Sequence, residues 1–282
     1  MKQFANITVI GKDRTGVVAR VTNLLFETHS NIEALEEQVT RGQFSMTILA
    51  SWKLKDWNRD SLQTGLQKLA ADLGMEIRLR STDPKQKQRV AIFVTKEPHC
   101  LTTLLDAFKR GTLKRAEPTL ILSNRSDLEP IAKKYGVPFK LVPWTERAPA
   151  ERQTIAALEE YQIDFLILAR FMKILSPEFA WRYKNKIINI HPSLLPSFPG
   201  AQAYRQAYEH GVKIIGVTAH FVNMHLDEGP IIAQDCFRVD PGMTLQQIVT
   251  RGQALESKTL LKAVQLYLAK RLDVFWGIVK QV

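Results

Sequence analysis

The sequence predicts an α/β protein of two domains, a small α+β domain followed by a larger domain with a mostly parallel sheet. The first eighty residues show strand and helix patterns in the order β-α-β-β-α-β, which is that of a ferredoxin-like unit. Beyond a polar stretch at 81–88, short apolar runs alternate with helical patterns, which is typical of a parallel sheet covered on both faces. We therefore expect domains at 1–82 and 89–282, joined by a linker at 83–88.

The elements of the first domain follow from apolar periodicity and turn residues. Arg41 and Gly42 are expected to form the turn of a hairpin, and Asp60 is expected to cap the second helix. Strands are expected at 4–10, 32–40, 44–52 and 75–79, and helices at 16–28 and 60–73.

The second domain is expected to contain seven strands and six helices, the last of them long. The strand candidates are 90–95, 120–122, 139–142, 165–169, 187–190, 214–222 and 231–239. The helix candidates are 99–109, 127–135, 150–161, 176–183, 202–210 and 245–269.

Composition is that of a globular protein, with 45% hydrophobic and 24% charged residues among 282. No apolar run approaches the length of a signal peptide or of a membrane span, and two cysteines make no disulfide framework, so we expect a cytoplasmic protein without membrane contact. The net charge is +11, but basic residues occur in short scattered groups without interleaved aromatics. This pattern favours a basic solvated surface or an anionic small substrate over nucleic acid.

Chemistry concentrates in two stretches, 184–204 and 218–230. In the first, Asn189 and His191 are two residues apart on a buried strand, so both side chains point to one face, and three prolines and a glycine stiffen the loop that follows. In the second, Asp227 precedes a Gly-Pro turn. An amide, an imidazole and a carboxylate are the parts that acyl transfer needs, although each alone is also common as a purely structural residue.

The first domain resembles the ACT family of regulatory domains, through GKDRTG at 11–16 and Ser30-Asn31-Ile32. The resemblance implies an effector site for an amino acid, methionine or glycine, and pairing of sheets in a homo-oligomer. Its candidate residues are Asp13, Arg14, Gly16 and Asn31. Helix capping and turn geometry would explain Asp13 and Gly16 equally well.

The second domain resembles the catalytic domain of formyltransferases and hydrolases that use 10-formyltetrahydrofolate. The motifs are RFMKILSP at 170–177, INIHPSLLPSFPG at 188–200 and HFVNMHLDEGPII at 220–232, and the resemblance covers about 89–265. It implies a Rossmann-like fold with catalytic Asn189, His191 and Asp227. The implied substrate-binding residues are Met172, Lys173, Ile174, Leu175, Gly200, His220 and Val222.

The segment VTKEPHCL at 94–101 is similar to that of the formyltetrahydrofolate deformylases. At the same position, amine-accepting relatives carry a glycine- and serine-rich phosphate loop instead. The resemblance implies that water attacks the formyl group, giving tetrahydrofolate and formate for purine biosynthesis and for the balance of one-carbon folate pools. Folate is then a substrate, and neither a resident cofactor nor a metal is implied. Glu97 and Pro98 would receive phosphate poorly.

Other functions share this core. Formyl transfer to an amine acceptor is the main alternative, whether the acceptor is a nucleotide, a sugar nucleotide or an initiator tRNA, and an inactive folate or amino-acid sensor is another. Pro192 and Arg205 stand where relatives often carry histidine. The sequence leaves the roles of His99, Cys100, His225 and Glu228 open.

Overall fold

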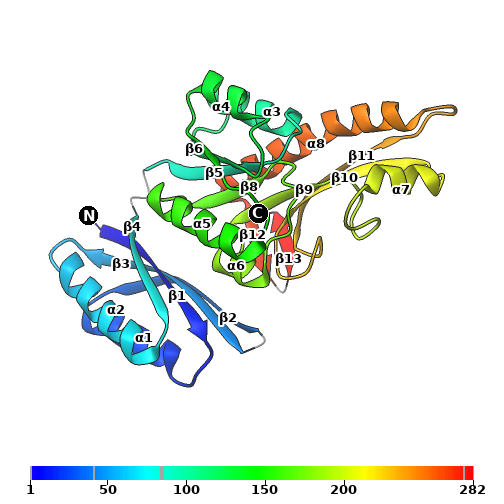
Figure 1. Cartoon of the computed structure of the whole chain (residues 1–282). Coiled ribbons are helices and arrows are strands. Elements are labelled where there is room, and N and C mark those ends of the chain that lie inside the picture. The colour runs from blue at the N-terminus through cyan, green and yellow to red at the C-terminus, as the bar shows by residue number, and fades with distance from the viewer. Residues whose placement is uncertain (1, 41, 83–85, 276, 282) are drawn as a thin grey trace. The chain divides into compact units, whose positions relative to one another are not determined.

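The computed structural model describes residues 2–40, 42–82, 86–275 and 277–281. The chain forms two compact units, residues 1–86 and 87–282, which Figure 1 draws in blue to cyan and in cyan to red. The linker expected at 83–88 includes residues 83–85, which lie outside the described residues. The two units are described separately below.

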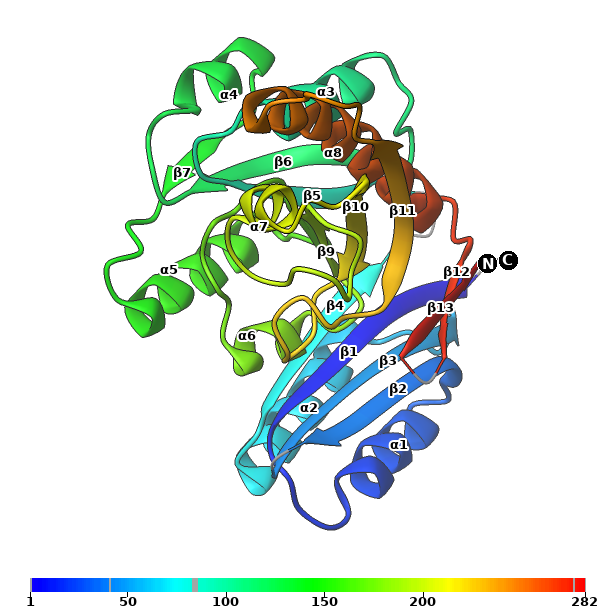
Figure 2. The ribbon, with the colours of Figure 1, turned by 90° about the vertical axis from the view of Figure 1, so that its right-hand side faces the viewer.

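The first unit is a four-stranded antiparallel sheet with two helices on one face. Its sheet order is β2-β3-β1-β4, which together with the chain order gives a ferredoxin-like fold. Alternate residues of β1 and β3 are buried and pack with apolar residues of both helices. Figure 2 shows the ribbon of the sheet and of the two helices. The elements are β1 Lys2–Lys12, α1 Val17–Glu27, β2 Asn31–Thr40, β3 Gln43–Lys53, α2 Arg59–Leu73 and β4 Glu76–Thr82.

One helix cap in this unit differs from the expectation, whereas the hairpin turn agrees with it at Gly42. Asn58, not Asp60, caps α2, because its side chain accepts a hydrogen bond from the Ser61 N–H at 3.0 Å, whereas Asp60 already lies in the first helical turn. Gly42 has a left-handed backbone (φ 73°) between β2 and β3, as a hairpin turn requires, and Arg41 lies outside the described residues.

The second unit contains a seven-stranded mixed sheet in the order β11-β10-β9-β8-β5-β6-β7. The five strands from β9 to β7 are parallel, whereas β10 and β11 are antiparallel to their neighbours. The strands are β5 Gln88–Val94, β6 Ala116–Ser123, β7 Phe139–Leu141, β8 Phe165–Leu168, β9 Ile187–His191, β10 Ile214–Phe221 and β11 Ile231–Arg238.

Helices cover both faces of this sheet, as the sequence predicts. One core cluster packs α3, α4 and α8 against the sheet, and a second packs α5 and α6 against the opposite face. The helices are α3 His99–Lys109, α4 Glu129–Tyr135, α5 Arg147–Glu160, α6 Pro177–Arg182, α7 Ala203–Glu209 and α8 Leu245–Leu268. None of the helices in the described ranges combines the length and the hydropathy needed to cross a lipid bilayer.

The sequence patterns did not indicate two short antiparallel strands near the C-terminal end, β12 Leu272–Phe275 and β13 Ile278–Gln281. Each strand has four residues, too few for a period of two to stand out. The two cysteines of the unit are free thiols: Cys100 is buried in α3 and Cys236 is exposed on β11.

Candidate active site

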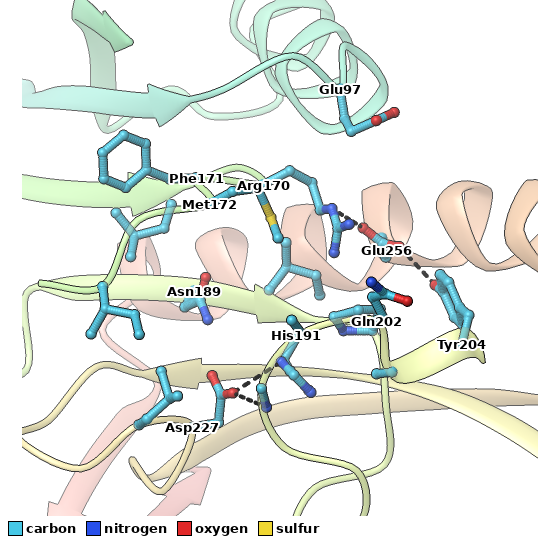
Figure 3. Close-up of a pocket in the computed structure, with 18 of the residues that line it drawn as sticks. Glu97, Arg170, Phe171, Met172, Asn189, His191, Gln202, Tyr204, Asp227 and Glu256 are labelled. Carbon is cyan, nitrogen blue, oxygen red and sulfur yellow. Dashed lines mark hydrogen bonds and ion pairs between the residues drawn. The ribbon is translucent and has the colours of Figure 1, made fainter. Parts of the chain in front are cut away.

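Strand β9 delivers Asn189 and His191 to one cavity. Ile188 and Ile190 belong to the core beneath α8, so the pleat directs the intervening side chains to the other side of the strand. Both Asn189 and His191 line a cavity of about 640 Å³, and Figure 3 shows their side chains there.

His191 is almost fully buried and lies between two acceptors. Its Nε2 lies 2.9 Å from the carbonyl oxygen of Phe198, and its Nδ1 lies 3.3 Å from Oδ2 of Asp227. A carbonyl and a carboxylate can only accept, so the ring satisfies both neighbours when each of its nitrogens carries a hydrogen. The geometry therefore suits the imidazolium cation, a charged donor in the wall of the cavity.

Asn189 is oriented by His220. The ring of His220 donates from Nδ1 to the carbonyl oxygen of Phe221 at 2.8 Å, which leaves Nε2 to accept from the Asn189 amide nitrogen at 3.1 Å. Burial lowers the pKa of His220, as does nearby His191, while the Phe221 carbonyl and Asp227 act in the opposite direction. A neutral His220 thus fixes the amide of Asn189, whose nitrogen carries a second hydrogen for the cavity.

Asp227 reaches His191 from a loop that folds back over the sheet. Because β10 is antiparallel to β9, its last residue, Phe221, lies opposite Ile188 and not beside the end of β9. The loop then brings the Asp227 carboxylate to His191 and to the Gly200 N–H, which donates to Oδ2 at 2.9 Å. Asp227 has a left-handed backbone conformation (φ 58°), which aspartate adopts more readily than most residues other than glycine.

Residues 171–175 form another wall of the cavity. Phe171 packs edge-on against Phe93 and Trp144, with ring centroids 5.3 and 5.2 Å away, and the Met172 N–H donates to the Thr95 hydroxyl at 3.0 Å. Beyond this anchor, Met172 and Ile174 keep 51% and 57% of their surface exposed. They provide an exposed apolar surface on this side of the cavity.

The structure thus brings the expected catalytic and substrate-binding residues of the second domain to one cavity. The cavity lining includes Asn189, His191, Asp227, Met172, Lys173, Ile174, Leu175, Gly200, His220 and Val222. His225 also lines it, whereas Glu228 is exposed on the loop outside the lining.

The expected effector residues do not meet within one chain. Asp13 and Gly16 lie in the turn after β1, next to the end of the β2–β3 hairpin, where the Asp13 N–H donates to the Gly42 carbonyl at 2.8 Å. Asn31 begins β2 and pairs with Ser51, at the other end of the sheet. Gly16 is left-handed (φ 89°) and caps α1 without a side-chain bond, so Asp13 makes no cap there.

Arg14 and Asn31, the other two residues expected to bind an effector, have structural partners. The Arg14 guanidinium donates to the Leu73 carbonyl at 2.7 Å, at the C-terminus of α2. Asn31 forms a hydrogen bond with the Glu33 carboxylate. The hydrogen bonds from Ser51, Lys2 and Asn31 lower the pKa of Glu33 to about 2.

The lining residues that were not among the predicted site residues include Arg170, Tyr204 and Glu256. Glu256 lies on α8 among buried Ile248, Gly252, Leu260 and Ala263, which recur at helical spacing. A carboxylate within such an apolar stripe was the signal in the sequence that could have marked it.

Comparisons with known proteins agree with this geometry. Residues 88–264 match the formyl transferase family model, and residues 3–80 match an ACT domain model. The chain is 38% identical to a formyltetrahydrofolate deformylase of Escherichia coli strain K12 over 276 residues, 95% of each chain. It is 37% identical to that of Bacillus subtilis strain 168, covering 93% of this chain and 88% of the relative.

Solved structures show the same similarity. A formyltetrahydrofolate deformylase from Burkholderia mallei superposes with a TM-score of 0.66 at 33% identity and covers 99% of both chains. A phosphoribosylglycinamide formyltransferase from Anaplasma phagocytophilum has a TM-score of 0.64 at 35% identity and covers 70% of this chain and 95% of its own.

Proposed function

The chain belongs to the formyltetrahydrofolate deformylase family, and from that premise we propose how its cavity performs the reaction. The enzyme hydrolyses 10-formyltetrahydrofolate to tetrahydrofolate and formate. The apolar side chains of Met172 and Ile174 contact the pterin ring, while backbone groups of Lys173 to Leu175 bind its polar edge, and His220, Val222 and Gly200 complete the pocket. We further propose that the formate supplies purine biosynthesis and that the reaction balances one-carbon folate pools.

Catalysis rests on Asn189, His191 and Asp227. Water attacks the formyl carbon, and the electron pair of the C=O double bond moves to oxygen, giving a tetrahedral oxyanion. The Asn189 amide donates a hydrogen bond to this oxygen, and so does the His191 imidazolium when the oxygen takes the place of the Phe198 carbonyl at Nε2. Each bond is worth roughly 2.7 to 4 kcal/mol in such sites. The C–N bond then breaks, its electron pair stays on the folate nitrogen, and His191 supplies the proton.

Asp227 has two roles in this scheme. One carboxylate oxygen stabilises the imidazolium, and the other orients the attacking water. The water gives up two protons as formate forms; one restores His191 and the other leaves to solvent. The observation that carries the proposal is the His191 ring held between Asp227 and the Phe198 carbonyl in the cavity that also contains Asn189.

The test is to incubate purified full-length protein with 10-formyltetrahydrofolate and no amine. We expect tetrahydrofolate and formate to accumulate in equal amounts, measured by absorbance and by a formate dehydrogenase assay. If the formyl group stays on the folate until an amine is added, the chain is a transferase, and if it stays on in either case, the chain is not a folate enzyme.

For the first domain, an ACT domain, we propose an amino-acid effector, methionine or glycine, bound at Asp13, Arg14, Gly16 and Asn31 of paired subunits. In support, β2 is an edge strand of the sheet with mostly exposed residues, so it can pair with another copy. Antiparallel pairing along β2 would set Asn31 of one copy at the Thr40 end of the other, the end of the sheet that carries Asp13.

Isothermal titration with each amino acid, with Asp13→Ala as the control, tests this site. Heat from the parent that disappears in the variant is expected, and equal heats from both proteins would rule out the turn as the binding place. Sedimentation at micromolar concentration tests pairing, which a monomer profile would contradict.

We also propose that the enzyme acts without a resident cofactor or metal, because the polar groups above can stabilise each charge that the reaction develops. A cytoplasmic location is part of the proposal, and the sparing use of cysteine supports it. Dialysis against a chelator is expected to leave formate release unchanged; a loss of activity that zinc or iron restores would contradict this.

A further inference from the structure

A buried carboxylate links three elements at one side of the cavity. Glu256 of α8 has a side chain with no exposed surface. It contacts His99 Nε2 of α3 at 3.0 Å, Arg170 Nε at 3.3 Å and the Tyr204 hydroxyl of α7 at 2.7 Å, as Figure 3 shows for the last two. We call Glu256, His99, Arg170 and Tyr204 the Glu256 cluster.

The cluster holds an ionised carboxylate whose charge is compensated. Burial alone would raise the pKa of Glu256, but the hydrogen bond from His99, the charge of Arg170 and the hydroxyl of Tyr204 together lower it. Burial and then the charge of Glu256 raise the pKa of Tyr204. The cavity wall therefore contains an anion that is already paired.

Steric details show that the cluster is tightly built. A Cβ on Gly252, one turn before Glu256, would lie 2.3 Å from the Tyr204 ring and hydroxyl, so glycine leaves the room that this ring needs. Nearby on the same helix, Gln253 donates to the Glu97 carboxylate at 3.2 Å, which adds a second acidic group to this side of the cavity.

A metal site is the competing explanation, because ligand atoms of His99, Cys100 and Glu256 lie within 4.8 Å of one another. Arg170 argues against it, since its guanidinium pairs with the carboxylate oxygen that a cation would need. Burial, followed by the charge of Glu256, raises the pKa of the Cys100 thiol, so the sulfur is protonated and a poor ligand. The arrangement suits an occupied ion pair.

We propose that the Glu256 cluster is the specificity determinant of the reaction: it fills the acceptor side of the cavity, excludes amine acceptors and leaves water as the nucleophile. This inference rests on the proposed function. To bind beside the formyl carbon, an amine would need a carboxylate that accepts a hydrogen bond from it. The Glu256 carboxylate is already paired with Arg170. An acceptor with a phosphate group meets the charge of Glu97, while the guanidinium that could bind it, that of Arg170, is already paired with Glu256.

The first test frees the carboxylate. Arg170 has a left-handed backbone (φ 64°), so Arg170→Gly removes the guanidinium without backbone strain. With glycinamide as the probe, its amine nitrogen should attack the formyl carbon and transfer one proton to the departing folate nitrogen. We expect the ratio of N-formylglycinamide to formate, measured by chromatography, to rise about tenfold, the effect of one charge-assisted hydrogen bond.

The second test leaves the guanidinium without its anion. In Glu256→Gln, inorganic phosphate should become a competitive inhibitor of hydrolysis that binds about tenfold more tightly than to the parent. Arg251→Ala is the matched control, because Arg251 lies on the same helix outside the cavity lining in an exposed pair with Asp240. We expect it to keep the parental product ratio and phosphate sensitivity.

Parental ratios in folded Arg170→Gly, or parental phosphate inhibition in folded Glu256→Gln, would overturn the proposal. So would loss of folding in both variants, checked by circular dichroism, because the cluster would then be a folding element. A parent protein that releases no formate without amine would instead remove the proposed function, and it is assayed first for that reason.

Discussion

At the residue scale, the chemistry of His191 depends on groups that the chain brings from a distance. Its position two residues after Asn189 could be predicted from the strand pattern, and both residues line the cavity. The Phe198 carbonyl that accepts from its ring could not, because backbone groups leave no mark in a sequence. Glu256 was missed for a related reason, since its significance depends on three side chains from other elements.

The catalytic assignments predict the cost of each substitution. Asn189→Ala removes one oxyanion donor, and His191→Ala also removes the acid, so kcat should fall about 10²- to 10³-fold for the first and further for the second. Asp227→Asn should cost a similar factor because it cannot stabilise the imidazolium. Steady-state formate release measures these values, and turnover near the parental rate would remove the role in question.

Buried His220 is expected to make the free energy of unfolding decrease in acid. Burial lowers its pKa in the folded chain below the ordinary value of 6.5, so between the two values the unfolded chain binds more protons. Its contribution is complete above pH 6.5 and is lost as the pH falls below it. Urea unfolding at several pH values should show a drop in the free energy of unfolding that is smaller in His220→Gln; equal slopes would contradict this.

At the scale of elements, helix positions could be predicted more fully than strand directions. Apolar spacing located α3 and α8 closely because their buried stripes are long. The antiparallel pairing of β10 with β9 and with β11 could not be predicted, since a buried strand shows the same apolar run in either direction. The direction of β10 is the reason that a loop, not a strand end, carries Asp227.

Gly229 is expected to be indispensable to this loop. A Cβ there would lie 1.6 Å from the Phe221 carbonyl oxygen, and backbone atoms cannot turn aside as a side chain can. Gly229→Ala should lower the free energy of unfolding by about 1–3 kcal/mol or more and reduce kcat by displacing Asp227. Gly111→Ala is the control: its left-handed site is open, so it should cost about 1–2 kcal/mol without changing kcat.

At the scale of the whole molecule, each unit carries its own hydrophobic core. One cluster draws only on the first unit and three draw only on the second. The fold class could be predicted because the order of patterns changes near residue 81, from a hairpin-containing order to alternating strands and helices. The association of copies follows only from the resemblance to ACT domains and from the exposed edge strand β2, and it stays a prediction.

A chain of residues 87–282 should therefore fold and hydrolyse 10-formyltetrahydrofolate without the first unit. We expect kcat within about threefold of the full chain, since the proposed catalytic residues all lie in the second unit, and no response to methionine or glycine. Formate release with and without each amino acid measures both. Retained regulation would place the effector site outside the first unit.

The contrast between the two thiols offers a reporter for the second unit alone. Cys236 is exposed, whereas Cys100, in the first turn of α3, is buried and its thiol has a raised pKa. A maleimide dye should modify one sulfur per native molecule and two after denaturation, as counted by intact-mass spectrometry. The rate at which the Cys100 sulfur reacts thus reports the unfolding of the second unit. The first unit has no cysteine and gives no signal.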